Sequence, residues 1–332
     1  TANLPDPAIP LPEEQFNTVL WAGDGQTNRA ITGVGHASDF VWVKSRTDTE
    51  WHNLYDKIRG VGKQVWSNST SAETTYDSGE GLKVFGADGF TVGNSEIING
   101  ASRNYVGWSW KANGSGSTNT EGGIDCVLSA NPTAGFSIAT YDGNNTIGHG
   151  LGKIPQLIIC KPLRSYDWIV YYNVVDGSSD YMRLNTTAAG ATGGGTYTSS
   201  VASAQVNGSC VQYHFVSIPG FSKIGVYTGN GSATDGPFIN CGFRPAFFLL
   251  KRATDTGDHN WFIADNKRDP SNVVDLILTP DLADAESSAG TLADFVSNGV
   301  KIMNSGASIN GNGATFLYMA FAESPFKYAN AR

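Results

Sequence analysis

The fold is decided by the stretch GFRPAFFLLK at residues 242–251, which occurs in two further versions, GHASDFVWVK at 35–44 and GKIPQLIICK at 152–161. Each version has a glycine, two variable residues, a proline or serine, one variable residue, four apolar residues and a lysine. The glycine and the proline or serine indicate a turn, and the apolar run after them is typical of a buried strand. Because the pattern recurs three times without gaps, the sequence predicts an array of related units.

The pattern divides the chain into three tandem units, each expected to be an antiparallel β-sandwich (jelly-roll-like) domain of an all-β protein. The chain has 40 glycines among 332 residues, and such a content favours many turns between short strands. A parallel sheet would need helical crossovers, and no unit has a segment that predicts one. The expected boundaries are an extended proline-rich N-terminal arm at 1–15, sandwich repeat 1 at 16–112, a glycine- and serine-rich linker at 113–133, repeat 2 at 134–218, repeat 3 at 219–324 and a C-terminal tail at 325–332.

The connections between the units predict how the units move. Repeats 2 and 3 are joined by Pro219-Gly220 alone, so we expect them to pack rigidly. The linker at 113–133 is flexible by composition, so we expect repeat 1 to swing on it. Repeat 2 lacks the Gly-Phe strand that precedes the closing strand of repeat 1, and its sandwich is expected to be smaller.

Charge and composition exclude several classes of partner. The formal net charge is −8, whereas nucleic acids and anionic membrane surfaces need a basic patch. No apolar run of about 18 residues is present, so no membrane insertion is expected. The cysteines have no metal-binding spacing and are best explained as buried core residues, although disulfides stay open; they are Cys126, Cys160, Cys210 and Cys241.

No motif in the sequence predicts catalysis, a cofactor or a metal site. The five histidines are scattered, and neither a nucleophile elbow nor a phosphate-binding loop occurs. The carboxylate pairs Asp281/Asp284 and Glu13/Glu14 could serve a glycosidase, but nothing distinguishes them from surface charge. Asp24, Asp142 and Asn230 lie in glycine-rich turns, where a plain turn is favoured over a calcium site.

Two sets of residues recur at equivalent places in the units. Lys44, Lys161 and Lys251 end the repeated stretch, and we interpret them as strand-end lysines that return the chain to solvent and blunt a sheet edge. The aromatics after that stretch recur as well, which fits core packing better than sugar stacking; they are Trp51, Trp168 and Trp261.

Three aromatic residues lie outside the repeat pattern, in segments that read as loops. They are Trp66, Tyr76 and Tyr197. Because aromatic rings can stack on the apolar faces of sugars, these three residues are the candidates for contact with a glycan.

Several segments together resemble a family of repeat-containing virion or tail-associated proteins of marine and environmental phages. The resemblance rests on the three signature strands with their lysines and on four further segments: NLPDP at 3–7, YVGWSWK at 105–111, YTGNG at 227–231 and AFAESPFKYANAR at 320–332. It covers nearly the whole chain and implies a structural protein of the phage virion, of the tail or tail fibre. It implies no ligand, reaction or catalytic residue.

The resemblance also sets the expected partners and location. We expect a non-enzymatic appendage on the virion surface, assembled in the host cytoplasm, that contacts other virion proteins and contributes to host attachment. A homo-oligomer is expected, with a trimer favoured, and avidity would strengthen many weak contacts. The alternatives are a capsid decoration or head-fibre protein held by the proline-rich arm, an adhesin that binds a host surface glycan, and a depolymerase that would need an essential carboxylate pair.

Overall fold

The computed structural model describes residues 6–76, 79–203, 206–254, 257 and 259–328. This part of the chain is nearly all β, and its strands pair antiparallel within the sheets. Its helical elements are the 3-10 turn η1 (Pro12–Glu14) and two four-residue helices, α1 (Glu96–Asn99) and α2 (Ala307–Asn310). The predicted all-β class is confirmed.

The strands fall into three consecutive sets, which we call the first, second and third units. The first unit contains β1 (Phe16–Ala22), β2 (Arg29–Thr32), β3 (Phe40–Ser45), β4 (Asn53–Asp56), β5 (Lys63–Trp66), β6 (Thr74–Thr75), β7 (Leu82–Gly86), β8 (Gly89–Val92) and β9 (Asn104–Trp110). The second contains β10 (Ser117–Asn119), β11 (Cys126–Asn131), β12 (Phe136–Asp142), β13 (Thr146–Gly148), β14 (Leu157–Pro162), β15 (Ile169–Tyr172), β16 (Asp180–Arg183), β17 (Ala191–Thr192), β18 (Val201–Ser203) and β19 (Ser209–Phe215). The third contains β20 (Ser222–Thr228), β21 (Phe238–Asn240), β22 (Phe243–Arg252), β23 (Phe262–Asp265), β24 (Val274–Ile277), β25 (Ser287–Val296), β26 (Gly299–Ile302) and β27 (Thr315–Pro325).

One strand order recurs in a sheet of each unit: β1-β9-β3-β4, then β12-β19-β14-β15, then β20-β27-β22-β23. The three signature stretches form β3, β14 and β22, which lie inside these sheets beside the closing strands. Each unit also has a second sheet, with the orders β2-β8-β7, β13-β18 and β21-β26-β25-β24. The second sheet of the second unit has two strands against three and four in the others, but its main sheet has eight strands against six and four, so the expectation of a smaller unit holds for the second sheet alone.

The apolar runs of the signature strands are buried on both faces because each strand borders two cores. In β3, Phe40 and Trp42 point into a core that all three units share, whereas Val41 and Val43 point into a core inside the first unit. Neighbouring residues of a strand point to opposite faces of its sheet, so a strand between two cores needs four consecutive apolar residues. β14 and β22 divide their apolar residues in the same way.

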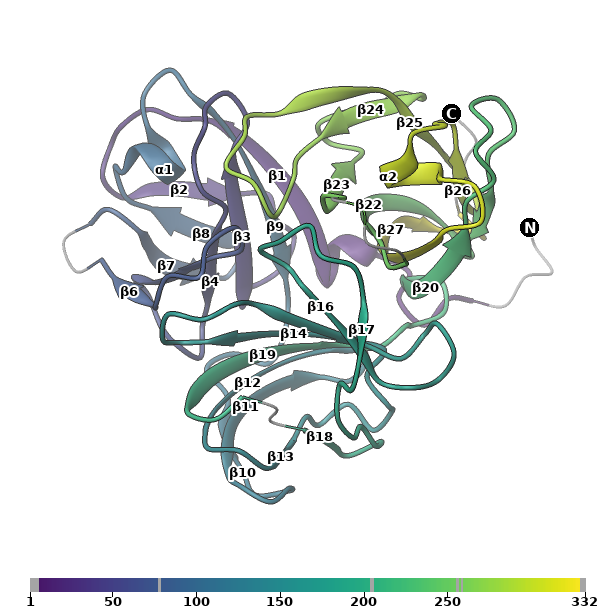
Figure 1. The fold of residues 1–332 in the computed structure, drawn as a ribbon. Coiled ribbons are helices and arrows are strands. Elements are labelled where there is room, and N and C mark those ends of the chain that lie inside the picture. The colour runs from purple at the N-terminus through teal and green to yellow at the C-terminus, as the bar shows by residue number, and fades with distance from the viewer. Residues whose placement is uncertain (1–5, 77–78, 204–205, 255–256, 258, 329–332) are drawn as a thin grey trace.

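Three rings mark the centre of the shared core. Trp110, Phe215 and Phe321 hold equivalent places on the three closing strands, each opposite the first apolar residue of its signature strand. Their ring centroids are 6.4 Å (Trp110–Phe215), 6.3 Å (Phe215–Phe321) and 5.8 Å (Trp110–Phe321) apart. The triangle places a pseudo-threefold axis through the protein, and Figure 1 shows the units as three lobes around it, from purple through teal to yellow.

The units are also joined by equivalent hydrogen bonds that run around the axis in one direction. A backbone N–H of each unit donates to the chain two residues after the signature lysine of the next: Glu73 to Leu163 (2.9 Å), Gly190 to Ala253 (2.9 Å) and Glu286 to Arg46 (2.8 Å). The third bond returns to the first unit, so the ring of interfaces is closed. The expectation that the first unit swings freely is therefore wrong, because that unit shares a core and two seams with its neighbours.

Two buried aspartates, each paired with an arginine of its own unit, accept hydrogen bonds across two of the seams. At the seam between the third and first units, Arg268 donates to Asp265 at 2.5 Å, and the Trp108 indole donates to the same carboxylate at 3.1 Å. At the seam between the first and second units, the Tyr213 hydroxyl donates to Asp56 at 2.8 Å. Asp56 and Asp265 are the last residues of β4 and β23, so these contacts occupy equivalent places in the ring.

The signature lysines are buried, not exposed at a sheet edge: Lys44, Lys161 and Lys251 are each 0% exposed. Their Nζ atoms donate to backbone carbonyls, Lys44 to Ser45 and Asp48, Lys161 to Thr70, Arg164 and Tyr166, and Lys251 to Thr187 and Arg252. Burial lowers the pKa of Lys44 and of Lys161 to about 8. The interpretation of these lysines as exposed residues that blunt a sheet edge is therefore wrong. Backbone carbonyls replace water around each ammonium group, and for Lys161 and Lys251 they include a carbonyl of the preceding unit.

The segment expected to be a flexible linker, residues 113–133, contains strands of the second unit. β11 pairs with β12 along its whole length and β10 pairs with β11. The start of the segment is fixed to the first unit, because Asp39 accepts hydrogen bonds from the N–H groups of Ala112 (2.9 Å) and Gly114 (3.2 Å). Its glycine and serine content reflects turns between strands.

The aromatic residues after the signature strands keep their predicted core role in two units. Trp168 and Trp261 are 0% and 1% exposed, but Trp51 is 42% exposed. The strand register shows the reason: His52, not Trp51, precedes the partner strand of the first unit as the two tryptophans do in the others. The four cysteines are buried and unpaired, as the core interpretation predicts.

Candidate functional site

The three predicted glycan-contact residues do not form a site. Trp66 is 7% exposed and lies at the seam between the first and second units, where its carbonyl accepts a hydrogen bond from the indole N–H of Trp168 at 2.7 Å. Tyr197 is half-buried, packs against Tyr171 and donates its hydroxyl to the Gly194 carbonyl. Tyr76 is half-buried and follows β6 in the first unit, away from the second-unit loop of Tyr197. The prediction for Trp66 is therefore wrong, because the residue is a core residue.

The glycine-rich turns are closed by amide groups. In the third unit, the Asn310 side chain donates to Asn230 Oδ1 at 3.1 Å and to the Ser232 carbonyl at 2.9 Å. In the first unit, Asn99 donates to Asp24 Oδ1 at 2.9 Å. These amide groups give the turn oxygens hydrogen-bond donors from the chain itself, which is consistent with a plain turn. Within the described residues, no group of three or more His, Cys, Asp or Glu side chains could hold a metal ion.

The two carboxylate pairs differ in burial. Asp281 is 6% exposed and accepts the backbone N–H of Trp261 at 3.0 Å, whereas Asp284 is exposed. Burial raises the pKa of Asp281 to about 7. Glu13 and Glu14 are both exposed in η1. Asp281 is thus a structural carboxylate that holds the strand partner of the third signature strand.

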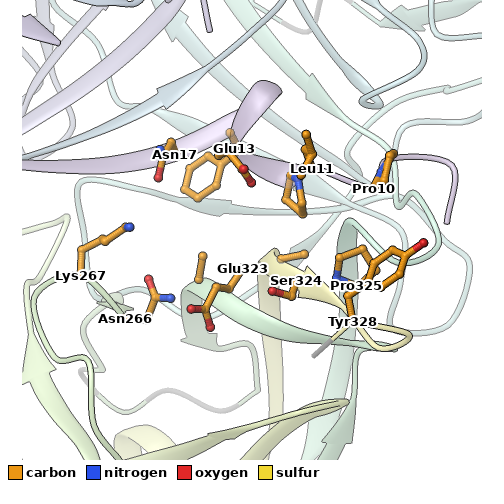
Figure 2. Close-up of a pocket in the computed structure, with 14 residues that line it drawn as sticks. Pro10, Leu11, Glu13, Asn17, Asn266, Lys267, Glu323, Ser324, Pro325 and Tyr328 are labelled. Carbon is orange, nitrogen blue, oxygen red and sulfur yellow. The ribbon is translucent and has the colours of Figure 1, made fainter. Parts of the chain in front are cut away.

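The best-formed candidate site is a groove of about 660 Å³ between the N-terminal segment and the third unit. Figure 2 shows its two walls: Pro10, Leu11, Glu13 and Asn17 on one side, and Asn266, Lys267, Glu323, Ser324, Pro325 and Tyr328 on the other. The first wall is held by η1 and β1, and the second by the ends of β23 and β27. The volume is within the range of about 300–1,000 Å³ that is typical of small-molecule sites.

The charges that line this groove nearly cancel. Glu323 forms an ion pair with Arg244, which is 3% exposed, so the charge of this carboxylate is compensated from behind the wall. Glu13 and Lys267 contribute one negative and one positive charge. The remaining lining alternates apolar surface with amide and hydroxyl groups, so the groove suits a ligand without net charge.

Asn266 gives the groove an unsatisfied hydrogen-bonding group. The residue is 7% exposed, and its backbone N–H donates to the Ala246 carbonyl at 3.0 Å. Its side-chain Oδ1 is buried and has no hydrogen-bond partner among the described residues. A buried polar atom without a partner costs about 1–3 kcal/mol. Rotation about the last side-chain bond, which has a broad energy profile, would present this oxygen to the groove.

The side chains at the equivalent places of the other two units each have a partner. Asn173 and Lys57 follow the last residues of β15 and β4, as Asn266 follows β23. The Asn173 side chain donates to the Pro155 carbonyl at 3.1 Å, and the Lys57 ammonium lies 3.5 Å from Asp39. Among the described residues, the side chains at positions 57 and 173 therefore have a partner, whereas the Asn266 oxygen has none; Asp39 Oδ1, opposite Lys57, is also buried without a hydrogen bond.

Of the groove residues, the sequence points to Glu13, as part of a carboxylate pair, and to the closing segment that holds Glu323 and Tyr328, but no signal joins them to Asn266 in one site. The run that ends at Asp265 is followed directly by Asn266 and Lys267, and the closing segment includes Glu323 and Tyr328. No spacing rule connects these segments to the arm at 1–15, because the ring closure brings them together. Among the described residues, no helix has the length and apolar character needed to cross a membrane.

The comparisons with known proteins identify a family but no function. A family model described as "Domain of unknown function (DUF7483)" matches residues 11–325. Neither a curated protein nor a solved structure matches the chain significantly. The match spans η1 and all three units, so the chain belongs to the DUF7483 family.

Proposed function

We propose that this protein is a structural component of a phage virion, forming part of a tail fibre or another exposed tail-associated appendage that contributes to host attachment. Its body consists of three related β-sandwich (jelly-roll-like) units. The family resemblance supports the virion origin, and the closed ring of interfaces supports the mechanical role. Each unit is held on two sides by its neighbours, so local opening of one unit would also disrupt the shared core.

The closed ring is the observation that carries the proposal. A heterologous interface that repeats with a closing rotation generates a ring, and here one chain makes that ring by itself. Such a body presents three similar lobes around one axis. It can therefore seat on a threefold axis of a tail assembly while its outer loops, which differ between units, vary without loss of the core.

Two oligomeric states are compatible with this geometry. The favoured homotrimer would align three such bodies as a fibre segment. Alternatively, a single chain supplies the threefold geometry and attaches as one copy. Light scattering on the purified chain distinguishes a mass near 35.2 kDa from three times that value.

A capsid decoration protein anchored by its N-terminal arm is the second candidate. One contact argues against it: Asp6, where the described part of the arm begins, forms an ion pair with Lys327 at 2.6 Å, so this part of the arm lies against its own chain. The Lys327 ammonium lowers the pKa of this exposed aspartate. An arm used as an anchor would have to leave this contact.

Immunogold electron microscopy tests the proposal directly. Antibodies raised against the purified chain should label the tails of particles of the phage that encodes it. Label on the head would instead support the decoration role. Particles that carry no label at either place, although the chain is present in the infected cell, would refute a structural role in the virion.

A further inference from the structure

We propose that the groove between the N-terminal segment and the third unit binds a neutral saccharide through Asn266. The inference rests on the proposed attachment role only for the source of the sugar, a glycan of the host surface. The site itself is argued from the lining of the groove, from the unpaired amide and from the contrast with the equivalent positions.

The groove offers the two kinds of surface that a sugar ring needs. Pro10, Leu11, Pro325 and the Tyr328 ring, which is 50% exposed, give apolar faces for the C–H face of a sugar. Glu13, Lys267 and the Ser324 hydroxyl give acceptors and donors at the rim. Hydroxyl groups both donate and accept hydrogen bonds, so a ligand rich in hydroxyls can satisfy this mixture.

The charge of the groove selects against strongly charged ligands. The Glu323 carboxylate is paired with Arg244, and Glu13 and Lys267 balance each other. An anionic sugar would gain from Lys267 but would face Glu13, and it would have to compete with Glu323 for Arg244. A neutral hexose avoids both costs, so the lining fits neutral saccharides best.

Asn266 is the residue whose hydrogen bonding improves when a sugar binds. Its buried Oδ1 has no hydrogen-bond partner among the described residues, and a hydroxyl donor from the ligand would satisfy it once the amide turns. An interaction that removes an existing penalty contributes more than one that replaces a contact with water. The matched position in the second unit, Asn173, is already used by the Pro155 carbonyl, which makes it a natural control.

Saturation-transfer NMR tests the site with four neutral probes: lactose, maltotriose, cellotriose and chitotriose. We expect signal transfer from the protein to at least one probe and little transfer to the charged comparison probe 3′-sialyllactose. Asn266→Ala should weaken binding of the positive probe about tenfold, the effect of one hydrogen bond of about 1.4 kcal/mol. Asn173→Ala should leave it within twofold, and both variants should keep the native circular dichroism spectrum.

The outcomes separate this inference from the proposed function. The saccharide site is overturned if none of the four probes binds at 10 mM, if Asn266→Ala binds like the unmodified protein, or if Asn173→Ala weakens binding equally. Should an Asn266→Ala protein fail to fold, Tyr328→Ala provides the second test, because it removes an exposed ring face. Tail labelling in the immunogold experiment would still stand in each of these cases, so a structural appendage without this sugar site would be the result.

Discussion

Replacing Phe215 by alanine tests whether the three units unfold as one body. Phe215 is 2% exposed, belongs to the second unit and contacts Trp110 of the first and Phe321 of the third at the axis. Truncating a buried phenylalanine to alanine costs about 3–5 kcal/mol. Because the cavity forms in the core that all three units share, the substitution lowers the unfolding free energy of the whole protein.

The size of the Tm shift depends on the size of the cooperative unit. Unfolding entropy is about 2.1 cal/mol/K per residue, or about 0.7 kcal/mol/K for a body of 332 residues, so about 4 kcal/mol lowers Tm by about 6 °C. An independent unit of about 100 residues has an unfolding entropy of about 0.2 kcal/mol/K, and the same loss would lower its Tm by about 19 °C.

Differential scanning calorimetry separates the two cases. We expect one transition in the unmodified protein and one transition, about 6 °C lower, in Phe215→Ala. The control Phe295→Ala removes a ring from the core inside the third unit, where Phe295 is 0% exposed, and it should move the same single transition. The reasoning is refuted if several transitions appear and each substitution moves a different one by about 19 °C.

Three further predictions concern the seams and the titratable groups. Asp265→Ala removes the acceptor of the Trp108 indole and leaves the 0%-exposed Arg268 side chain with Glu286 as its carboxylate partner. It should lower the unfolding free energy by about 3 kcal/mol in urea denaturation; a loss below about 1 kcal/mol would show that this carboxylate does not stabilise the seam. Lys161→Met leaves the Thr70, Arg164 and Tyr166 carbonyls without the ammonium donor and should cost about 1–3 kcal/mol at pH 7, whereas an exposed lysine at a sheet edge would cost almost nothing. Burial lowers the pKa of His52 and of His214 well below the ordinary value of 6.5, so below pH 6.5 the unfolded chain binds protons that the folded chain does not. Below that pH, each histidine should lower the unfolding free energy by about 1.4 kcal/mol per pH unit. Asp281, whose pKa burial raises to about 7, offsets the effect of one histidine, because its folded form takes up a proton in the same range. Urea denaturation should therefore give a lower unfolding free energy at pH 5.5 than at pH 6.5, and a higher value at pH 5.5 would contradict the assignment of these buried neutral histidines.

Much of the strand arrangement can be predicted from the signature stretches. A four-residue apolar run after a turn signal located β3, β14 and β22, and the recurring aromatics after these runs predicted core positions, which Trp168 and Trp261 occupy directly before β15 and β23. These predictions work because turns are set by local sequence. A strand that is buried on both faces also appears in the sequence as an uninterrupted apolar run, which is easy to locate.

The ring closure could not be predicted in the same way. The signature lysines look like solvent-exposed strand ends, because the carbonyls of Thr70 and Thr187 that receive two of them come from a different unit. The linker was misjudged because turn-rich composition outweighed the short apolar alternation of β11. Only long-range packing explains both features.

The candidate site shows the same limit. Trp66 was selected because it lies outside the repeat pattern, yet its carbonyl is part of a seam. Asn266 carries no motif, and its importance comes from an oxygen that the fold leaves unpaired. A signal of this kind exists only in three dimensions, when equivalent positions such as Asn173 can be compared.

Small-angle X-ray scattering on the monomer fraction from size-exclusion chromatography tests the closed ring most directly. A compact body of 332 residues should have a radius of gyration of about 20 Å. Three separate units of about 100 residues, each with a radius of gyration of about 13 Å and touching in a row, would together have a radius of gyration of about 30 Å. A value near 20 Å is the result that the closed ring predicts, and a value above about 25 Å would contradict it.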